Sequence, residues 1–577
     1  MRILLLIVFL ITGNCSLAQV LSTTRTTNWK KAKHIGAYFE PSLTVNILQY
    51  GGNNNGAIAN DAALIAAVNA LNGMPGIIYL PAGNYLFNNT INLRDSLILR
   101  GSGTNTVLTF SFNNASKHCI TISGSVMGGW VSVGSGLRKN SKWIKPAVIT
   151  SFKVGDLLEM RQLNGSWDTQ PVAWAQYAVG QILYVDSIKN DKLYFHEKLR
   201  IDYDTLLQPQ VARLKPRKSV GVECLKITRT DSNAAGNNYG VFLNKAYNCW
   251  IKNVTIEKMI SAHVCITTSA RCEITGSYIT DAYSFDGSNT HGYGVLINEH
   301  ACENKIENNV FKKLRHAITC KQGANGNVIA YNYVTQPTRT EFPTDAGADL
   351  LLHGHYPFLN LFEGNICQNI QADQTWGPNG PYNTFMRNRA DGYGLIITSG
   401  SISTNNQNII ANDITNTGFL KGNYSLSGNN HFEFGNRVKG TVTPANTANV
   451  TVNSYYLNNT PTWWNGTWPT IGLPVAFNIA GNSAQTRFAN GSYTVTCNNS
   501  AVKVGLGNYF SVYPNPSAAD FIFSNEVSLL NVTNVLGIAQ AFTLDGRNLT
   551  IHAPAGVYNV FVCINGQTVN QKLILVK

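Results

Sequence analysis

Histidine, aspartate and arginine side chains gather between residues 281 and 389 of this 577-residue chain. An imidazole beside a carboxylate makes a general base, and nearby cations stabilise negative charge that develops on a substrate. From the repeat described below, we predict that His316 and Asp349 form a hydrogen-bonded dyad. The candidate catalytic residues are His316, Asp349, His353, Lys321 and Arg315.

Other polar and aromatic side chains in the same region are candidates for binding a substrate. Arg387 and Arg389 lie on one face of a predicted strand and could clamp a carboxylate or sulfate. Trp376 precedes Gly-Pro-Asn-Gly and is a candidate stacking platform for a sugar. The substrate-binding candidates are His291, Tyr293, His355, Asp345, Asp373, Trp376, Arg387 and Arg389.

Metal binding is a second interpretation of part of this set. His353 and His355 share one face of a strand, but no clear third ligand accompanies them, so a transition metal is not assigned. Asp345 and Asp349 are candidate calcium ligands, although their spacing is not diagnostic. The sequence requires no cofactor.

A repeated pattern positions these residues. Asn-x-x-x-x-Asn recurs from residues 248, 304, 327, 360 and 383, and weaker copies end at 276, 412 and 436. Successive end points are 23, 33, 23, 33, 23, 24 and 24 residues apart. A period of about 23 residues with apolar runs is typical of a solenoid of stacked coils.

The two intervals of 33 residues each hold about ten extra residues, and these include many of the candidates. Coils stack about 4.8 Å apart, so residues at one phase of the repeat become neighbours. Counting eleven residues back from the first Asn of each pattern aligns Tyr293, His316 and Asp349. The long turns are expected to form the walls of a groove whose floor carries Arg315, His316 and Lys321.

The N-terminal region contains a capping pattern. Residues 60–71 have helical periodicity, and Gly76-Ile-Ile-Tyr-Leu-Pro-Ala-Gly-Asn-Tyr-Leu-Phe87 and Ser96-Leu-Ile-Leu-Arg-Gly-Ser-Gly103 follow as strands. This order resembles the entry into pectate-lyase-like right-handed parallel β-helix proteins, in which a helix covers the open end of the solenoid. The resemblance implies an all-β fold and an activity on polysaccharides. It carries no family's catalytic residues over, because neither the aspartate motifs of polygalacturonases nor the arginine signature of pectate lyases is present.

Both ends of the chain indicate export. Met1-Arg2 and the apolar run 3–11 are typical of a signal peptide, and 16–18 resembles a cleavage site. Near the other end, Val512-Tyr-Pro-Asn-Pro-Ser517, Asn534-Val-Leu-Gly537 and Lys572-Leu-Ile-Leu-Val-Lys577 resemble the type IX secretion sorting domain of Bacteroidetes. We therefore expect a secreted or cell-surface protein that uses the type IX machinery and has no membrane span.

These patterns divide the chain into six parts. Between residues 125 and 218 the repeat disappears and short strands predict an antiparallel insertion, whose Trp167, Trp174 and Tyr177 either pack in a core or bind sugar. The expected parts are a signal peptide (1–18), a cap with the first coils (39–124), the insertion (125–218), a β-helix catalytic region (219–440), a closing segment (441–505) and a β-sandwich sorting domain (506–577).

Composition bears on the partner. The formal net charge is +13, although only 13% of residues are charged. For an exported protein, this charge favours an acidic polysaccharide over nucleic acid. β-Elimination on a uronate, with His316 or His353 as base, is the first hypothesis. Hydrolysis by two of Asp345, Asp349 and Asp373 is the second, and a non-enzymatic adhesin or glycan-binding β-helix is the third.

Overall fold

The computed structural model of the protein describes residues 21–478, 481–497, 512–513, 515–518, 520–523, 528–534, 538–564 and 567–576. The predicted signal peptide lies outside the described residues. The chain separates into two compact units, one ending at Ala501 and one formed mainly by Val502–Lys577.

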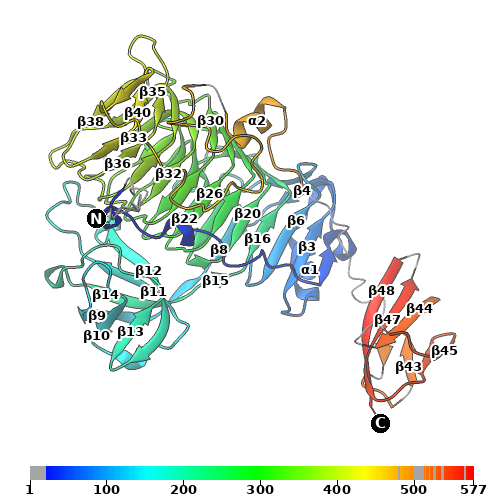
Figure 1. Ribbon diagram of the computed structural model, residues 1–577. Helices are drawn as coiled ribbons and strands as arrows, with labels where there is room; N and C mark the ends of the chain where they lie inside the picture. The colour runs from blue at the N-terminus through cyan, green and yellow to red at the C-terminus, as the bar shows by residue number, and fades with distance from the viewer. Residues whose placement is uncertain are drawn as a thin grey trace, which may run out of the picture. The chain divides into compact units, whose positions relative to one another are not determined.

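The first unit is built around a parallel β-helix, which confirms the predicted fold class (Figure 1). Each full coil contributes one strand to each of three parallel ladders. The first ladder forms a sheet of its own. The second and third ladders join into one larger sheet, because two long strands bend from one ladder into the other.

The strands follow one another around the coils in regular order. The first ladder contains β3 (Gly76–Leu80), β6 (Leu97–Gly101), β16 (Gly221–Glu223), β20 (Trp250–Lys252), β23 (Glu273–Thr275), β26 (Lys305–Glu307), β29 (Val328–Ala330), β32 (Leu361–Glu363), β34 (Thr384–Met386), β36 (Asn408–Ile410) and β39 (Phe432–Phe434). The second contains β2 (Asn55–Ala59), β4 (Gly83–Phe87), β7 (Thr106–Phe110), β17 (Lys226–Arg229), β21 (Thr255–Met259), β24 (Tyr278–Ala282), β27 (Val310–Lys312), β30 (Tyr333–Thr335), β33 (Ile366–Ala372), β35 (Arg389–Ile397), β37 (Asp413–Ile414) and β40 (Asn436–Val438). The third contains β5 (Ile91–Asn92), β8 (Ile120–Ser123), β18 (Val241–Asn244), β22 (Ala262–Thr267), β25 (Tyr293–Asn298), β28 (His316–Cys320), β31 (Leu350–Leu352), the ends of β33 and β35, and β38 (Asn423–Leu426).

The repeated asparagines form two buried hydrogen-bonded ladders inside the coils. In one ladder, the side-chain amide of Asn332 donates to Asn365 Oδ1 at 3.0 Å and to the Ile306 carbonyl at 2.9 Å. Asn309 donates in turn to Asn332 Oδ1 at 3.0 Å. Each asparagine therefore bonds to the coil before it and to the coil after it, which explains why the pattern recurs.

A helix lies near the N-terminal end of the β-helix, and an antiparallel barrel follows the first coils. Helix α1 (Asp61–Ala70) buries Ala63, Leu64 and Ala67. Between residues 125 and 215 the chain forms a closed antiparallel barrel with strand order β10-β13-β12-β11-β14-β9 (Figure 1). These strands are β9 (Ser125–Ser135), β10 (Trp143–Pro146), β11 (Leu157–Gln162), β12 (Val179–Lys189), β13 (Lys192–Phe195) and β14 (Gln210–Lys215).

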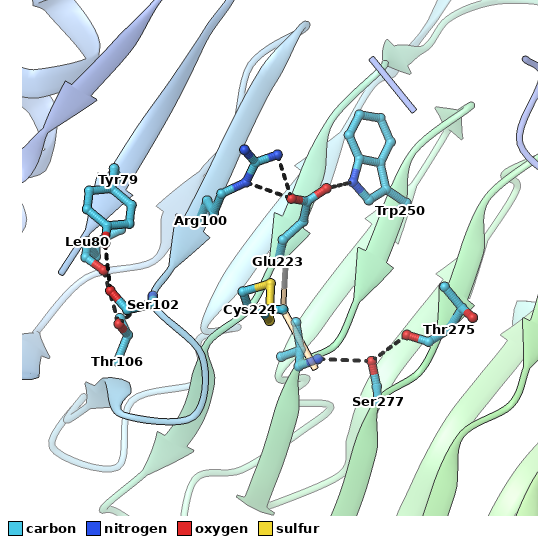
Figure 2. Close-up of a disulfide and its surroundings, with 12 residues drawn as sticks. Tyr79, Leu80, Arg100, Ser102, Thr106, Glu223, Cys224, Trp250, Thr275 and Ser277 are labelled. Atoms are coloured by element: carbon cyan, nitrogen blue, oxygen red, sulfur yellow. Dashed lines mark hydrogen bonds and ion pairs between the residues drawn. A yellow bond between two sulfur atoms is a disulfide. The ribbon is translucent and has the colours of Figure 1, made fainter. Parts of the chain in front are cut away.

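The segment after the last coil runs back along the first ladder. Tyr456 donates a hydrogen bond to Glu307 at 2.7 Å, and a disulfide joins Cys497 to Cys224 (Figure 2). Its helix α2 (Ser483–Ala489) contacts β27. The segment therefore covers the side of several coils. Cys249 and Cys272 lie side by side on adjacent coils, whereas Cys302 pairs with Ala270. All three are buried free thiols.

Charged side chains on the first ladder are also paired. Next to the disulfide, Glu223 accepts hydrogen bonds from Arg100, at 2.8 Å, and from the indole of Trp250 (Figure 2). Arg100 and Trp250 lie on the two neighbouring strands, β6 and β20. These contacts bind consecutive coils together on their outer face.

The second unit contains two antiparallel sheets. One has the order β42 (Val512–Tyr513), β43 (Asp520–Phe523), β46 (Asn548–Ile551), β45 (Phe542–Asp545), and the other has β44 (Ser528–Asn534), β47 (Gly556–Ile564), β48 (Gln567–Leu575). Phe521, Phe523, Val560 and Leu573 belong to its buried core. A sorting role for this unit stays a prediction. Within the described residues, no helix is long and apolar enough to cross a membrane.

Candidate active site

A cavity of about 820 Å³ lies over the third ladder at β25, β28 and β31. One wall comes from the long turns 283–292 and 336–349, which contribute Ser288, Asn289, Arg339 and Glu341. These turns touch each other, because the Gly287 amide donates to Glu341 Oε1 at 2.6 Å. The extra residues of both long intervals thus build one side of the cavity.

The opposite wall combines the β-helix with the inserted barrel. Trp174, from the loop between β11 and β12, lies edge-on to Trp376 with ring centres 5.1 Å apart. Lys321 Nζ is 5.2 Å from the centre of the Trp174 ring. Both indoles line the cavity. Of the three insertion aromatics, Trp167 instead packs on Tyr356, and Tyr177 covers the Arg161 guanidinium.

The histidine–carboxylate pair in this cavity is His353–Asp373. His353 follows β31 and Asp373 follows β33, so adjacent coils supply them. His353 Nδ1 donates to Asp373 Oδ2 at 2.8 Å and to Oδ1 at 3.0 Å. This bond fixes the tautomer with its lone pair on Nε2. Within the described part of the chain, no protein group bonds to Nε2, so that atom is available to a substrate.

The predicted His316–Asp349 dyad is wrong. The ring of His316 donates from Nδ1 to the Ala348 carbonyl at 2.8 Å. Asp349 Oδ2 accepts from the amides of Gln368 and Asn369, at 2.7 and 3.0 Å. Burial raises the pKa of the Asp349 carboxyl to about 7. Asp349 therefore lies inside the coil and does not line the cavity.

Unequal turn lengths cause this error. In the structure, Cys320 pairs with Leu352 and Leu352 with Ala372, whereas the count from the asparagines aligned Cys320 with His353. The turn that follows Leu352 is one residue longer than the turn that follows Cys320. A slip of one residue moves a side chain to the other face of a strand. Ala348, and not Asp349, therefore lies beside His316.

His316 nevertheless lines the cavity, with its ring centre 6.2 Å from that of His353 and 4.8 Å from that of Tyr293. Burial, together with the charges of Arg315 and His353, holds its pKa well below the usual range. Its Nε2 is buried and has no hydrogen-bond partner. His316 is therefore a neutral acceptor, and a poor site for holding a transferred proton.

Cations line the cavity beside the two imidazoles. Arg315, Lys321 and Arg339 are all lining residues. Burial lowers the pKa of the Lys321 ammonium, so this group is partly desolvated and its charge acts over short distances with little screening. The Arg315 guanidinium lies 5.8 Å from the centre of the Tyr293 ring. This set can receive a carboxylate.

Several predicted substrate-binding residues have structural partners elsewhere. Arg387 is buried and donates to the carbonyls of Val452, Ile471 and Leu473, so it holds the closing segment. Arg389 pairs with Asp391, 3.1 Å away, and does not line the cavity. Both predictions fail because the sequence did not show which face the closing segment covers.

Three other candidates also hold the walls together. His355 is fully buried and bonds to the Gln170 carbonyl of the insertion at 3.0 Å. His291 bonds to Asp286 at 2.8 Å inside the first long turn. Asp345 binds Lys421 at 2.6 Å and Tyr393 at 3.0 Å. These residues stabilise the segments that form the cavity walls, and none of them lines the cavity.

No cluster of three or more histidine, cysteine, aspartate or glutamate side chains suited to a metal ion occurs among the described residues. Asp345 faces a lysine and Asp349 faces backbone amides, so the two candidate calcium ligands do not converge.

One cavity residue escaped the sequence analysis. Glu299 directly follows β25 and lines the cavity. Burial and the nearby Glu159 raise the pKa of its carboxyl. The neighbouring His300 forms a buried ion pair with Glu159 of the barrel, 2.8 Å away. In the repeat, Asn298 aligns with Lys321, and Glu299 is the next residue. This position beside a predicted cavity residue could have identified Glu299 from the sequence.

The stacked coils, the capping helix and the lateral cavity define a parallel β-helix protein. A family model described as "Rhamnogalacturonase A/epimerase, pectate lyase-like" matches residues 44–154. That segment covers the cap, the first coils and part of the barrel, and ends before the cavity residues of the β-helix. None of the curated proteins matches this chain.

Solved structures with a similar fold include a tailspike protein, gp49, of Pseudomonas phage LKA1. It is 15% identical, with 68% of this chain and 79% of that chain covered and a TM-score of 0.46. A mannuronan C-5 epimerase A-module of Azotobacter vinelandii is 14% identical, with 68% and 85% covered and a TM-score of 0.40. The Gp54 tailspike of Acinetobacter baumannii bacteriophage AP22, in complex with a capsular saccharide, is 11% identical, with 70% and 78% covered and a TM-score of 0.33.

Proposed function

We propose that this protein is a secreted enzyme that cleaves an acidic polysaccharide by β-elimination in the cavity over the third ladder. The observation that carries the proposal is the 2.8 Å bond from His353 Nδ1 to Asp373, in a cavity that Arg315, Lys321 and Arg339 also line. A base oriented by a carboxylate beside clustered cations is what proton removal next to a uronate carboxylate requires.

The reaction assigns a task to each group. His353 Nε2 takes the proton from the sugar carbon that bears the carboxylate. The electron pair left behind spreads into the carboxylate, and Lys321 and the arginines stabilise that added negative charge. The pair then returns to form a carbon–carbon double bond, and the neighbouring bond to the glycosidic oxygen breaks. Asp373 stabilises the resulting imidazolium.

The leaving oxygen needs a proton, and Glu299 is the candidate donor. Its carboxyl lines the same cavity, and burial raises its pKa, so the acid form persists at higher pH than in an ordinary glutamate. His316 packs beside Tyr293 and His353 and helps to form the floor of the cavity. The basic charge of the chain, +13, supports an anionic substrate.

Hydrolysis by paired aspartates receives less support. It needs two carboxyl groups on either side of one bond. Among Asp345, Asp349 and Asp373, one is paired with Lys421 and one is buried inside the coil. Of the three aspartates, Asp373 lines the cavity, and its carboxylate accepts a hydrogen bond from His353.

The test is an assay over a panel of acidic polysaccharides that measures two products. Elimination gives an unsaturated uronate, which absorbs ultraviolet light, together with new reducing ends. Reducing ends without that absorbance would show a hydrolase, and binding without either product would show an adhesin. Export by the type IX route is part of the proposal, and it is tested by following secretion of the chain with and without residues 506–577.

A further inference from the structure

A second cavity, of about 410 Å³, adjoins the first beyond Asp373. It lies at the turns that follow β33 and β35, one coil further along the β-helix. The two cavities share Gln371, Asp373 and Thr375, so they are continuous at the His353–Asp373 pair. The other lining residues are Thr169, Gln170, Gln374, Thr398, Ser399, Gly400 and Ser401.

The chemistry changes sharply between the two cavities. The first cavity is lined by three cations, Arg315, Lys321 and Arg339, and also by the carboxyl groups of Glu299, Glu341 and Asp373. Among the described residues that line the second, Asp373 is the one charged side chain, and the others are amides, hydroxyls and a glycine. A sugar carboxylate or sulfate placed there would face a carboxylate without a cation to pair with it. Like charges in a partly enclosed site disfavour such a ligand.

The second cavity is nevertheless a polar site. Gln374 spans it, with its amide donating to the Thr398 carbonyl at 3.0 Å. Thr169 and Gln170 of the barrel insertion close the other side, where the Gln170 carbonyl accepts from His355. Ser399 and Ser401 are exposed and offer hydroxyls. Such groups hydrogen-bond to sugar hydroxyls without requiring a charge.

We propose that the second cavity is a subsite for an uncharged, hydroxyl-rich sugar residue. The inference rests on the proposed function and refines its substrate class. The acidic residue that reacts occupies the cationic cavity, and the residue bound beside it is neutral. The substrate is therefore a polysaccharide in which uronate and neutral sugars alternate, and not a homopolymer of uronates.

The first experiment compares kcat/KM on two kinds of polymer. The all-acidic probes are polygalacturonate and alginate, and the alternating probes are hyaluronan and rhamnogalacturonan. We expect an alternating probe to be preferred over the all-acidic ones by roughly tenfold to a hundredfold. Equal or better kcat/KM on the all-acidic probes would overturn the inference while leaving the proposed function intact.

Variants at Ser401 test whether the second cavity sets this preference. Ser401→Lys supplies a cation and should raise kcat/KM on the all-acidic probes, whereas Ser401→Gln adds similar length without charge and should not. Ser401→Trp fills the cavity and should weaken the preferred substrate. Ser401 is exposed, so the fold should tolerate all three. Unchanged selectivity in both Ser401→Lys and Ser401→Trp would also overturn the inference.

If no uronate polymer is converted, the proposed function fails. Binding measurements then test whether the second cavity is a sugar subsite. Titration calorimetry with oligosaccharides from the same probes should show tighter binding of an alternating one, and Ser401→Trp should remove that difference. Equal affinities, or no binding of any probe, would refute the subsite itself.

Discussion

The variant Asp349→Asn tests whether Asp349 is a buried structural carboxyl, as in the structure, or half of a catalytic dyad, as the repeat predicts. Asp349 is fully buried, its Oδ2 accepts two backbone amides, and its Oδ1 has no partner. Burial raises the pKa of its carboxyl from the ordinary 3.8 to about 7. The folded protein therefore keeps a proton on this group that the unfolded chain has already released.

Proton linkage gives the direction in which stability changes with pH. A raised folded-state pKa gives stability that is fully present below about pH 4 and is lost as pH rises towards 7. A shift of about three units at 1.36 kcal/mol each sets the loss at about 4 kcal/mol. Asparagine does not titrate. The free energy of unfolding of Asp349→Asn, minus that of the wild type, should therefore rise by up to about 4 kcal/mol from pH 4 to pH 8.

Chemical denaturation of both proteins at several pH values measures this difference. Packing of the amide can add a constant to the difference in the free energy of unfolding. This constant does not affect the test, because the test uses only the change of the difference with pH. Asp345→Asn is the matched control: Lys421 holds the pKa of Asp345 below its usual range, so its difference from the wild type should stay nearly flat from pH 4 to pH 8 and change only at lower pH. A difference that stays flat or falls with pH for Asp349→Asn would refute the burial argument. Loss of activity in a folded Asp349→Asn would restore the His316–Asp349 dyad.

Three further variants test the scaffold and the cavity. Asn332→Ala should lower the free energy of unfolding by about 2–4 kcal/mol, because several buried hydrogen bonds are lost, whereas Asn429→Ala, at an exposed position, should change it by less than about 0.5 kcal/mol. Lys321→Met should lower kcat/KM about a hundredfold and reduce its dependence on salt, and an unchanged rate would remove Lys321 from charge stabilisation. Trp174→Ala should raise KM roughly threefold to tenfold with little change in kcat, and a fall in kcat alone would contradict a role in sugar stacking.

The sequence predicted the scaffold well, because the Asn repeat records a local physical need. Each buried amide must satisfy the turns of two coils, so Asn309, Asn332 and Asn365 recur wherever a coil closes. The two long intervals likewise marked the side on which the cavity lies. Both features depend on spacing along the chain, which the sequence shows directly.

The identity of the dyad could not be obtained in the same way. Alignment from the asparagines assumed equal turns after the third ladder, but one extra residue after Leu352 moved Asp349 into the interior. Asp373 was one position away from the predicted phase and is the actual partner of His353. To align residues of neighbouring coils to within one position, the length of every turn must be known. The sequence alone does not show those lengths.

Long-range packing caused the remaining errors. Arg387 looked like an exposed clamp, yet a segment more than sixty residues later buries it against Val452 and Ile471. His355 is covered by a loop of the insertion, and Trp174 of that loop completes the cavity. No local pattern indicated that these segments fold over the coils.

The most direct test of the central claim is the formation of unsaturated product by the wild type and by Asp373→Asn on a uronate-containing polymer. We expect ultraviolet absorbance with the wild type and a fall in kcat of about a hundredfold to ten-thousandfold in a folded Asp373→Asn, because His353 loses the carboxylate that orients it. Wild-type kcat in Asp373→Asn, or bond cleavage without the absorbance, would contradict it.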